Sequence, residues 1–382
     1  MKYIAILGRQ HELALAELET LYGPESLEPI NKHACFINKP VEFERLGSTI
    51  KITRFIQTLE SQSIAQAIES VLPHILESRR ERTGKLQLGL STYGTRVTAS
   101  QINRAALDLK RKLRSEGVSL RLVPNKAPEL NAAQILNNKL TRENGFELNL
   151  IVDGNKTHLT QTLQVQAIDE YARRDRDKPV RDPLVGMLPP KLAQTLINLS
   201  GANPNQTILD PFCGTGTVLM EAFAMGINSY GSDISPEMIE ATRLNMDWFA
   251  KNQQQPSYNV KLADATSHQW ETNIDAVAGE TFLGPALRKI PEKHALKTII
   301  HDVDDIHRRF LLNLAPQLTS GVRVCLAVPS WHDSGVFIDL PCLDDLEKLG
   351  YNPSSFVFTH NKLVYHRPQQ VVGRRILNLV RK

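Results

Sequence analysis

Three aspartates stand where predicted strands end, and two glycines follow the first of them. Asp210 ends the apolar run TILD, Asp233 ends INSYGSD, and Asp264 follows NVKLA. Gly214 and Gly216 come soon after Asp210, just before a segment with a helical pattern, TVLMEAFAMG. Glycines between a strand and a helix let the backbone approach a ligand closely, and open α/β sheets bind nucleotides at this point. The pattern therefore predicts a nucleotide-type site at one edge of a sheet.

Each aspartate has its own chemical use at such a site. Asp210 can pair with an ammonium group, and Asp233 is placed to accept hydrogen bonds from ribose hydroxyls. Asp264, followed by Ala265, is placed to reach the amino group of an adenine ring. The G-T-G spacing lacks the third glycine of a dinucleotide pyrophosphate site. An amino acid joined to ribose and adenine describes S-adenosylmethionine, although any one of these acids alone is a common turn residue.

Alternating strands and helices from Thr207 onward must position these residues. After TILD and its helix come a strand at INSYGSD, a helix at SPEMIEATRLNMDWFA, strands at NVKLADA and IDAVAGE, a helix through VDDIHRRFLLNLAPQL and a strand at GVRVCLAVPSW. This rhythm indicates a parallel sheet. The stretches SSFVFTHNKLVYHRP and RRILNLVR read as further strands, joined at residues 360–362, and an antiparallel last strand is compatible with such a sheet.

The first half of the chain has an α+β pattern instead. Strand patterns occur at YIAILG, HACFIN, LQLGLSTYG and VSLRLVP, and helical patterns at ELALAELETLYG, 63–76, 99–117 and LNAAQILNNKL. The stretch FELNLIVDGNKTHLTQTLQ predicts a hairpin with its turn at residues 153–155. A polar connector, AIDEYARRDRDKPVRDP, and a helix opened by Pro189 and Pro190 lead to the second half.

Positive charge is concentrated in this first half. The formal net charge is +4, but residues 96–143 contain ten Lys or Arg against four acids, a local +6 that leaves −2 for the rest. Such an asymmetry predicts a polyanionic partner. Cations at the end of the predicted helix 99–117 also have a local explanation, because they complement the helix dipole. A solvated helix face is the alternative.

The composition argues against several classes of protein. Hydrophobic residues make up 41% and charged residues 23%, as in ordinary globular proteins, and no apolar run of about eighteen residues predicts a membrane span. The N-terminus reads as a strand and a helix rather than a signal peptide. Four distant cysteines and eleven histidines show no metal-ligand spacing. We therefore expect a reduced, cytoplasmic protein without a metal site or membrane partner, and a monomer.

The stretch DPFCGTGTVLMEA (210–222) resembles the cofactor loop of methyltransferases that carry an RNA-binding THUMP domain, and most closely that of the tRNA guanine-N2 methyltransferases acting at guanosine 10. The resemblance runs through most of the chain, including YIAILGRQHELALAELETLYG, LRLVPNKAPELNAAQILNNKL and RDRDKPVRDPLVGMLPPKLAQTLINL. It implies a ferredoxin-like element at 1–60, a THUMP domain at 61–166, a linker at 167–188 and a methyltransferase domain at 189–382. The implied fold is α/β, a class I (Rossmann-like) domain with a seven-stranded, mostly parallel sheet, preceded by an α+β module.

Site residues follow from this resemblance and from the charge pattern. The predicted cofactor-binding residues are Asp210, Pro211, Cys213, Gly214, Gly216, Thr217, Asp233, Ile234, Asp264 and Ala265. The predicted RNA-binding residues are Arg111, Arg114, Lys126, Lys139, Arg173 and Arg174. Local pairing of the arginines with aspartates is the alternative for Arg173 and Arg174, and an exposed loop lysine is the alternative for Lys126.

The predicted catalytic residues lie in the loop GETFLG. In the family that the chain resembles, the fourth strand ends in an Asp or Asn, two prolines and an aromatic residue. The acid or amide accepts hydrogen bonds from the exocyclic amine, and the aromatic ring stacks on the flipped base. Here Glu280 stands in place of the acid or amide, both prolines are missing, and the aromatic residue, Phe282, is shifted by one position. We expect Glu280 to be the acceptor and Phe282 to be the stacking residue.

Three functions are compatible with these patterns. The first is methylation of the N2 amine of a tRNA guanine with S-adenosylmethionine as cofactor. The second is methylation of another RNA base or of ribosomal RNA, which the altered loop motivates. The third is a tRNA-binding protein that has lost catalysis and in which Glu280 is merely solvated. The resemblance also leaves open one or two methyl transfers and a small activator protein as partner, because some relatives use one.

Overall fold

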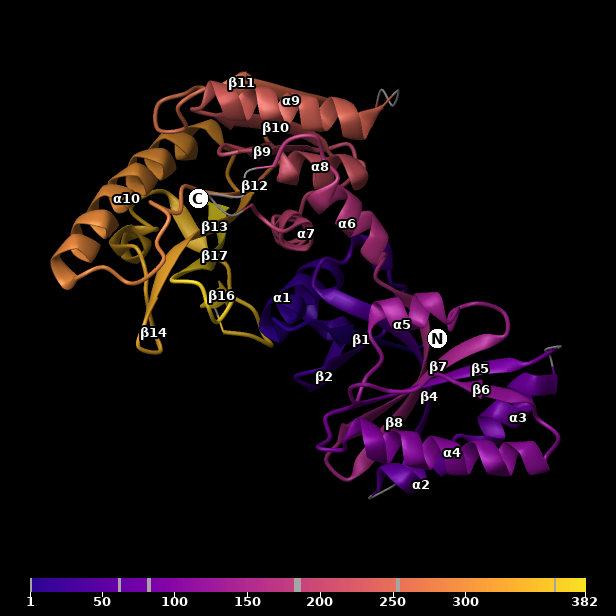
Figure 1. Cartoon of the computed structure of the whole chain (residues 1–382). Helices are drawn as coiled ribbons and strands as arrows, with labels where there is room; N and C mark the ends of the chain where they lie inside the picture. Colours follow the sequence, from indigo (N-terminus) through magenta and orange to yellow (C-terminus); the bar gives the residue numbers. More distant parts are fainter. Residues whose placement is uncertain (1, 61–62, 81–83, 182–186, 252–254, 361) are drawn as a thin grey trace. The chain divides into compact units, whose positions relative to one another are not determined.

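The computed structural model describes residues 2–60, 63–80, 84–181, 187–251, 255–360 and 362–382. The chain divides into two compact units. The first unit comprises residues 1–11, 22–44 and 49–168, and the second comprises residues 12–21, 45–48 and 169–382 (Figure 1).

The first unit is an α+β module. Its described residues form one eight-stranded sheet in the order β2-β3-β1-β4-β8-β7-β5-β6. The strands are β1 (Tyr3–Leu7), β2 (Leu27–Asn31), β3 (Ala34–Ile37), β4 (Thr49–Leu59), β5 (Leu86–Tyr93), β6 (Leu120–Leu122), β7 (Gly145–Asp153) and β8 (Lys156–Val165). The helices are α2 (Ile64–Glu69), α3 (Leu72–Arg80), α4 (Ala99–Ser115) and α5 (Ala132–Asn137), with short 3-10 turns at Pro24–Ser26 and Phe43–Arg45.

Two sequence-based expectations about this unit have clear outcomes. The hairpin is confirmed, because β7 and β8 pair as far as Asp153 and Lys156 around a two-residue turn. The single helix expected at 63–76 is wrong, because α2 ends at Glu69 and α3 begins at Leu72. Pro73 accounts for the break, since a proline has no N–H to donate and is tolerated only in the first turn of a helix.

The second unit has the strand order of a class I methyltransferase fold. Its main sheet runs β11-β10-β9-β12-β13-β17-β15, and β14 and β16 add to β13 and β17. The strands are β9 (Thr207–Asp210), β10 (Asn228–Asp233), β11 (Tyr258–Leu262), β12 (Ala276–Glu280), β13 (Arg323–Asp333), β14 (Val336–Ile338), β15 (Tyr351–Pro353), β16 (Leu363–Tyr365) and β17 (Val372–Arg381). The pairs from β11 to β13 are parallel and β17 is antiparallel to β13. The predicted α/β fold with a mostly parallel main sheet is thus confirmed, and the described residues form nine strands rather than seven, because the short strands β14 and β16 extend the seven-strand order.

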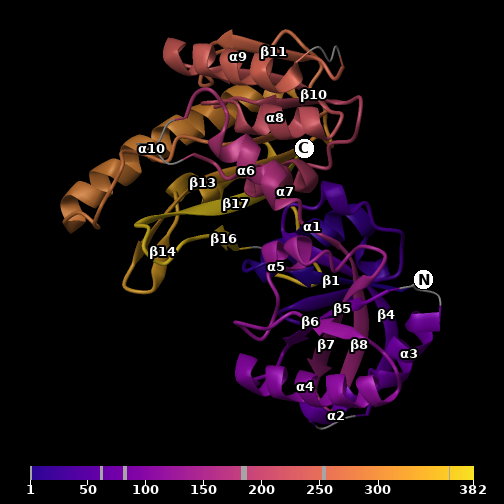
Figure 2. The same cartoon turned by 45° about the vertical axis from the view of Figure 1, so that its right-hand side comes forward.

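Helices cover both faces of this sheet because its strands alternate in which face each residue occupies. Ile208 and Ala278 pack with Leu196 of α7 in one core. Leu209 and Val277 pack with α10 in another. The helices of this unit are α1 (His11–Tyr22), α6 (Ile168–Arg176), α7 (Pro190–Leu199), α8 (Thr217–Ala224), α9 (Pro236–Ala250) and α10 (Lys293–Leu314), with 3-10 turns at Ala315–Gln317 and Pro341–Asp345. Figure 2 shows α8 and α9 beside the β10–β11 edge of the sheet.

One local expectation about this unit was wrong. Residues 354–360 form no strand, and within the described part of the predicted strand stretch 354–368 only Leu363–Tyr365 pairs with β17. The backbone N–H groups of Val357 and Phe358 instead donate to the Glu19 carboxylate of α1, at 2.7 and 3.2 Å, which satisfies them without a sheet partner. The predicted polar connector contains helix α6, whose first turn holds two acids and whose last turn holds three arginines.

No helix within the described part of the chain is long and apolar enough to cross a bilayer.

Candidate active site

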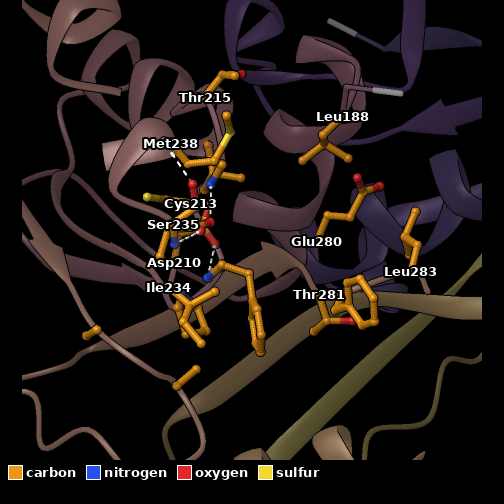
Figure 3. A pocket seen from close by; sticks show the side chains of 18 of the residues that line it. Leu188, Asp210, Cys213, Thr215, Ile234, Ser235, Met238, Glu280, Thr281 and Leu283 are labelled. Atoms are coloured by element: carbon orange, nitrogen blue, oxygen red, sulfur yellow. Dashed lines mark hydrogen bonds between the residues drawn. The ribbon is translucent and has the colours of Figure 1, made fainter. Parts of the chain in front are cut away.

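A pocket of about 690 Å³ opens where β9, β10 and β12 end (Figure 3). Its lining includes both predicted catalytic residues and most of the predicted cofactor residues. These are Asp210, Pro211, Cys213, Gly214, Thr217, Asp233, Ile234, Asp264, Ala265, Glu280 and Phe282. Gly216 is not among the lining residues, although it belongs to the same turn. The parallel strand order brings these residues together, since the carboxyl ends of parallel strands meet at one edge of the sheet.

The turn between β9 and α8 depends on glycine. Gly216 caps α8 in the left-handed region, with φ 81°, and a Cβ there would lie 2.9 Å from Cγ2 of Thr242. Gly214 also has a positive φ, and a Cβ at that position would meet no atom within 4 Å. The Thr242 hydroxyl donates to the Gly214 carbonyl at 2.6 Å and fixes the turn from α9. Backbone strain therefore requires glycine at both positions, and steric crowding requires it at Gly216.

Asp233 connects the turn to the next helix. Its Oδ2 accepts from the Gly214 N–H at 3.0 Å, and its Oδ1 accepts from the Ser235 N–H at 2.9 Å. Ser235 is itself the N-cap of α9. The carboxylate is therefore held at the mouth of the pocket by two backbone donors, which leaves lone pairs on both oxygens for a ligand.

Asp210 is a buried carboxyl group at the floor of the pocket. It is 2% exposed, and its Oδ1 accepts from the Phe212 N–H at 3.2 Å. Gly279 on β12 makes room for it, because a Cβ there would lie 2.4 Å from Oδ1. Burial raises the pKa of Asp210 well above its usual range, and the nearby Asp233 and Glu280 raise it further. A cationic ligand group at this place would relieve the repulsion among these acids.

The charge of the pocket suits a cation with an apolar ring. Four carboxyl groups, those of Asp210, Asp233, Asp264 and Glu280, line the pocket against one arginine, Arg309. Ile234, which is 70% exposed, and several other apolar side chains complete the lining. This set of groups fits S-adenosylmethionine, whose sulfonium and ammonium groups are positive and whose adenine is flat and apolar on its faces.

Glu280 lies on a different side of the pocket from Asp210, near Leu188 and Leu283 (Figure 3). It stands at the end of β12, and its side chain is 16% exposed. Its Oε2 accepts a hydrogen bond from Nε of Arg374, which β17 contributes. Burial raises the pKa of Glu280, and the Arg374 guanidinium opposes that rise.

Thr281, the residue after Glu280, is held in place by a hydrogen bond to a side chain of α10. Thr281 is 3% exposed, and its hydroxyl lies 2.6 Å from Nε2 of His307. Nδ1 of His307 lies 2.7 Å from the Val303 carbonyl, which assigns the proton to Nδ1 and makes Nε2 an acceptor for the threonine hydroxyl. Burial lowers the pKa of His307 to about 4, so the ring is neutral at physiological pH. This bond restrains a loop that has neither of the two prolines expected there.

Helix α6 and the residues after it contact α8 and the turn between β9 and α8 through two cations, Arg174 and Lys178. Nε of Arg174 donates to Oε1 of the fully buried Glu221 at 2.6 Å. Nζ of Lys178, which is 4% exposed, donates to the hydroxyls of Thr215 and Thr217 at 3.1 Å each. Burial lowers the pKa of Lys178 to about 8.

The predicted RNA-binding residues are mostly on the surface, with one correction. Arg111, Arg114, Lys126 and Lys139 are exposed, although Arg111 also pairs with Asp108 at 2.5 Å. Arg173 is exposed and lies over the Trp248 ring, at 5.4 Å from its centroid. Arg174 is different, because its side chain is 11% exposed and its Nε donates to Glu221. We therefore assign Arg174 to the interior of the second unit rather than to RNA.

Sequence reasoning missed Arg374, His307, Lys178 and Glu221. Glu221 had a signal, since a lone acid within the apolar helix TVLMEAFA suggests a buried partner. The other three had none, because each acts on a residue that lies 26 to 94 positions away in the chain.

The strand order and the acidic pocket at the carboxyl ends of the strands define the second unit as a class I methyltransferase fold. Residues 180–328 match the family model described as UPF0020, RMKL-like, methyltransferase domain. That match covers less than half of the chain, and it identifies these residues as a methyltransferase domain.

Two archaeal tRNA methyltransferases are similar to this chain in sequence. A tRNA (guanine(10)-N2)-dimethyltransferase of Methanothermobacter thermautotrophicus is 31% identical over 182 residues, which cover 47% of this chain and 50% of the relative. The enzyme of the same name from Pyrococcus abyssi is 28% identical over 282 residues, 69% of this chain and 78% of the relative. The match thus spans half the length of the first relative.

Two solved structures cover nearly the whole chain. TrmN from Thermus thermophilus aligns over 100% of both chains with a TM-score of 0.58 and 18% identity. SMU.472, a putative methyltransferase complexed with SAH, covers 98% of this chain and 97% of its own with a TM-score of 0.52 and 12% identity. At these identities the likeness establishes the fold of both units and nothing more specific.

Proposed function

We propose that this protein is an S-adenosylmethionine-dependent tRNA methyltransferase that acts on the exocyclic N2 amine of a guanine, most directly the one at position 10. The observation that carries the proposal is the placement of Glu280 in the same pocket as the three strand-end aspartates. The names of the archaeal relatives support the choice of tRNA and of the guanine amine.

The first unit supplies tRNA binding in this proposal. Residues 1–60 would be a ferredoxin-like element, 61–166 a THUMP domain, 167–188 a linker and 189–382 the catalytic domain. The local charge of +6 between residues 96 and 143 supports a phosphate-binding role, because lysines and arginines supply most of the sequence-independent affinity for RNA. We assign the phosphate contacts to Arg111, Arg114, Lys126, Lys139 and Arg173. A cytoplasmic monomer, assisted or not by a small activator protein, completes the proposal.

S-adenosylmethionine, when bound, supplies an electrophilic methyl group. Asp210 would hold its ammonium group, Asp233 its ribose hydroxyls and Asp264 its adenine amine. Asp264 is preset for this role, since the N–H and hydroxyl of Thr266 both bind its Oδ1, at 2.9 and 2.8 Å, and these bonds lower its pKa. An ionised Asp264 can then accept a hydrogen bond from the amine at pH 7.

Glu280 and Phe282 prepare the acceptor base. An aromatic amine is a weak nucleophile, because its lone pair is delocalised into the ring. A carboxylate that accepts one N–H of the amine localises the lone pair on nitrogen and stabilises the positive charge that grows there. As the N–CH3 bond forms and the S–CH3 bond breaks, the same carboxylate is placed to accept the proton that the methylated amine releases. Phe282, which is 44% exposed beside the pocket, is available to stack on the flipped base. Holding the two reactants about 3 Å apart supplies much of the remaining acceleration.

The decisive experiment identifies the product. The protein is incubated with methyl-labelled S-adenosylmethionine and unmodified tRNA, and the digested nucleosides are analysed by mass spectrometry. We expect N2-methylguanosine or its dimethyl form at position 10. A different methylated nucleoside would favour the second candidate, another RNA base, which the replaced prolines motivate. Binding of cofactor and tRNA without label transfer would exclude both.

The role of Glu280 has a matched test. Glu280→Gln should lower kcat roughly 10- to 100-fold, because an amide oxygen accepts a hydrogen bond but carries no charge to stabilise the transition state. The dissociation constant of S-adenosylmethionine should be unchanged. An unaltered rate in Glu280→Ala would remove Glu280 from the mechanism.

A further inference from the structure

Glu280 and Arg374 meet across an intervening strand. Glu280 of β12 is paired with Ala327 of β13, and Ala327 is paired with Ile376 of β17. Arg374 stands two residues from Ile376, so both point to the same face of the sheet. That face is the one that carries Ala278, two residues before Glu280, and Ala327. On β13, the strand between the two charged residues, Ala327 is paired with Glu280 and Pro329 is paired with Arg374.

The Glu280–Arg374 ion pair is largely buried. The Arg374 side chain is 6% exposed and the Glu280 side chain 16% exposed. Glu280 lines the pocket, whereas Arg374 is not among the lining residues. The bond from Nε uses Oε2 of Glu280. A carboxylate has two oxygens with two lone pairs each, so it can bind Arg374 and still accept a donor from the pocket.

The ionisation state of the Glu280 carboxyl group determines whether it can accept a hydrogen bond strongly and stabilise positive charge. Burial favours the protonated acid, and a protonated carboxyl group is a poorer acceptor with no charge to offer the transition state. Arg374 faces Glu280 from β17, and Asp210 faces it from β9 as a like charge. Among these groups only the guanidinium favours the ionised form. A buried ion pair contributes little net stability compared with apolar packing, so fold stability alone does not account for this one.

We propose that Arg374 is the positioning residue for the reaction. It binds Oε2 of Glu280, keeps that carboxylate ionised and oriented toward the target amine, and so replaces the rigidity that two prolines would give the loop. The catalytic part of this inference rests on the proposed function. The Arg374–Glu280 coupling itself does not, and it can be measured without a reaction.

Activity tests the catalytic part. Arg374→Gln should lower the single-turnover rate of methyl transfer at about pH 7 roughly 10- to 100-fold, with an unchanged dissociation constant for S-adenosylmethionine. The lost rate should recover as the pH rises, because Glu280 without its partner ionises at a higher pH. Arg374→Lys should retain most of the rate, because an ammonium preserves the charge. A wild-type rate and pH profile in Arg374→Gln would overturn the proposal.

The matched control is Arg375→Gln on the same strand. Arg375 is 8% exposed like its neighbour, but it points to the opposite face and lies 3.9 Å from Asp339. This variant should lose stability without the pH-dependent loss of rate. The same pH response in Arg375→Gln would mean that any buried cation of β17 suffices, and Arg374 would lose its assigned role.

Thermal unfolding tests the coupling without a substrate. A carboxyl group whose pKa is raised in the folded state stabilises the fold at low pH, and this stability is lost as the pH rises through the folded-state pKa. When the pH is raised from about 5 to about 8, the Tm of the Arg374→Gln variant should therefore fall by more than the Tm of the wild type. Adding Glu280→Gln should restore stability at pH 8, because the unpaired carboxylate is then gone.

The two tests separate the two proposals. A wild-type protein that transfers no methyl group would end the proposed function, while the thermal cycle would still decide the coupling. Additive effects of Glu280→Gln and Arg374→Gln on Tm would overturn the inference even if the enzyme is active.

Discussion

Asp233 ties the glycine turn to helix α9, and it would hold the ribose as well. Its two oxygens accept from the N–H groups of Gly214 and Ser235. In the proposed enzyme, this single residue would therefore link the shape of the turn to the bound ribose.

Asp233→Ala should weaken S-adenosylmethionine binding roughly 10- to 100-fold, because hydrogen bonds to a charged group are worth about 1.5–3 kcal/mol each. Isothermal titration calorimetry measures the effect. Asp333→Ala is the control, since Asp333 is exposed at the end of β13 and does not line the pocket. Equal affinity of the Asp233→Ala variant and the wild type would contradict the ribose assignment.

The buried His307 makes the stability of the fold depend on pH in the acid range. Its folded-state pKa of about 4 lies below the ordinary value of 6.5. A depressed pKa contributes stability that is present above the unfolded-state value and lost as the pH falls through the folded-state value. Between pH 6.5 and 4 this loss amounts to roughly 3 kcal/mol. Urea unfolding should show that His307→Gln lacks this part of the acid sensitivity, and an identical pH dependence in the two proteins would refute it.

At the scale of elements, helix α6 and the residues that follow it bind the turn between β9 and α8 and the first residues of α8. Asn245 of α9 completes the support. Its Nδ2 donates to the carbonyls of Val180 and Thr215, and its Oδ1 accepts from the Val180 N–H, all at 2.9 Å. The segment after α6 is therefore bonded both to the turn and to α9.

Lys178→Met should weaken S-adenosylmethionine binding roughly tenfold, because the Thr215 and Thr217 hydroxyls lose the cation that holds them. The control is Arg176→Gln, because Arg176 is the exposed last residue of α6, two positions before Lys178. The lysine also has a signature in stability. Its folded-state pKa is about 8 against an ordinary 10.5, so the wild type loses stability as the pH falls from 10.5 through 8. Thermal unfolding of Lys178→Met should lack that slope, and retention of the slope would assign it to another group.

At the scale of the whole molecule, the concentration of positive charge and the acidic pocket belong to different units. The basic stretch 96–143 lies in the first unit, and the acidic pocket lies in the second. In the proposed enzyme the first unit binds phosphates and the second selects the base.

The double change Arg111→Glu with Arg114→Glu should weaken tRNA binding and lower the salt dependence of log Kd by about 2, since each phosphate contact contributes about 0.9 to that slope. Filter binding across a KCl series measures it. Lys261→Glu, an exposed change in the second unit, is the control. An unchanged slope would place the phosphate contacts elsewhere.

Much of the fold followed from short-range patterns. The strand–turn–helix of residues 207–224 and the β7–β8 hairpin were predicted correctly, because each is contiguous and its glycines or turn residues are visible in the sequence. The break at Pro73 and the irregular 354–360 segment were not. In the second case, the backbone N–H groups are satisfied by Glu19, more than 300 residues away.

The sequence by itself determined the alternation of strands and helices, the glycine turn and the three strand-end acids, because these depend on residues close together in the chain. The tertiary structure decided which distant groups complete them. Glu280 meets Arg374 because of the order and register of β12, β13 and β17, and Thr281 meets His307 because α10 packs beneath the loop. Pairings of this kind depend on the order and register of the strands and on the packing of helices against them, and the local periodicity of the sequence predicts none of these.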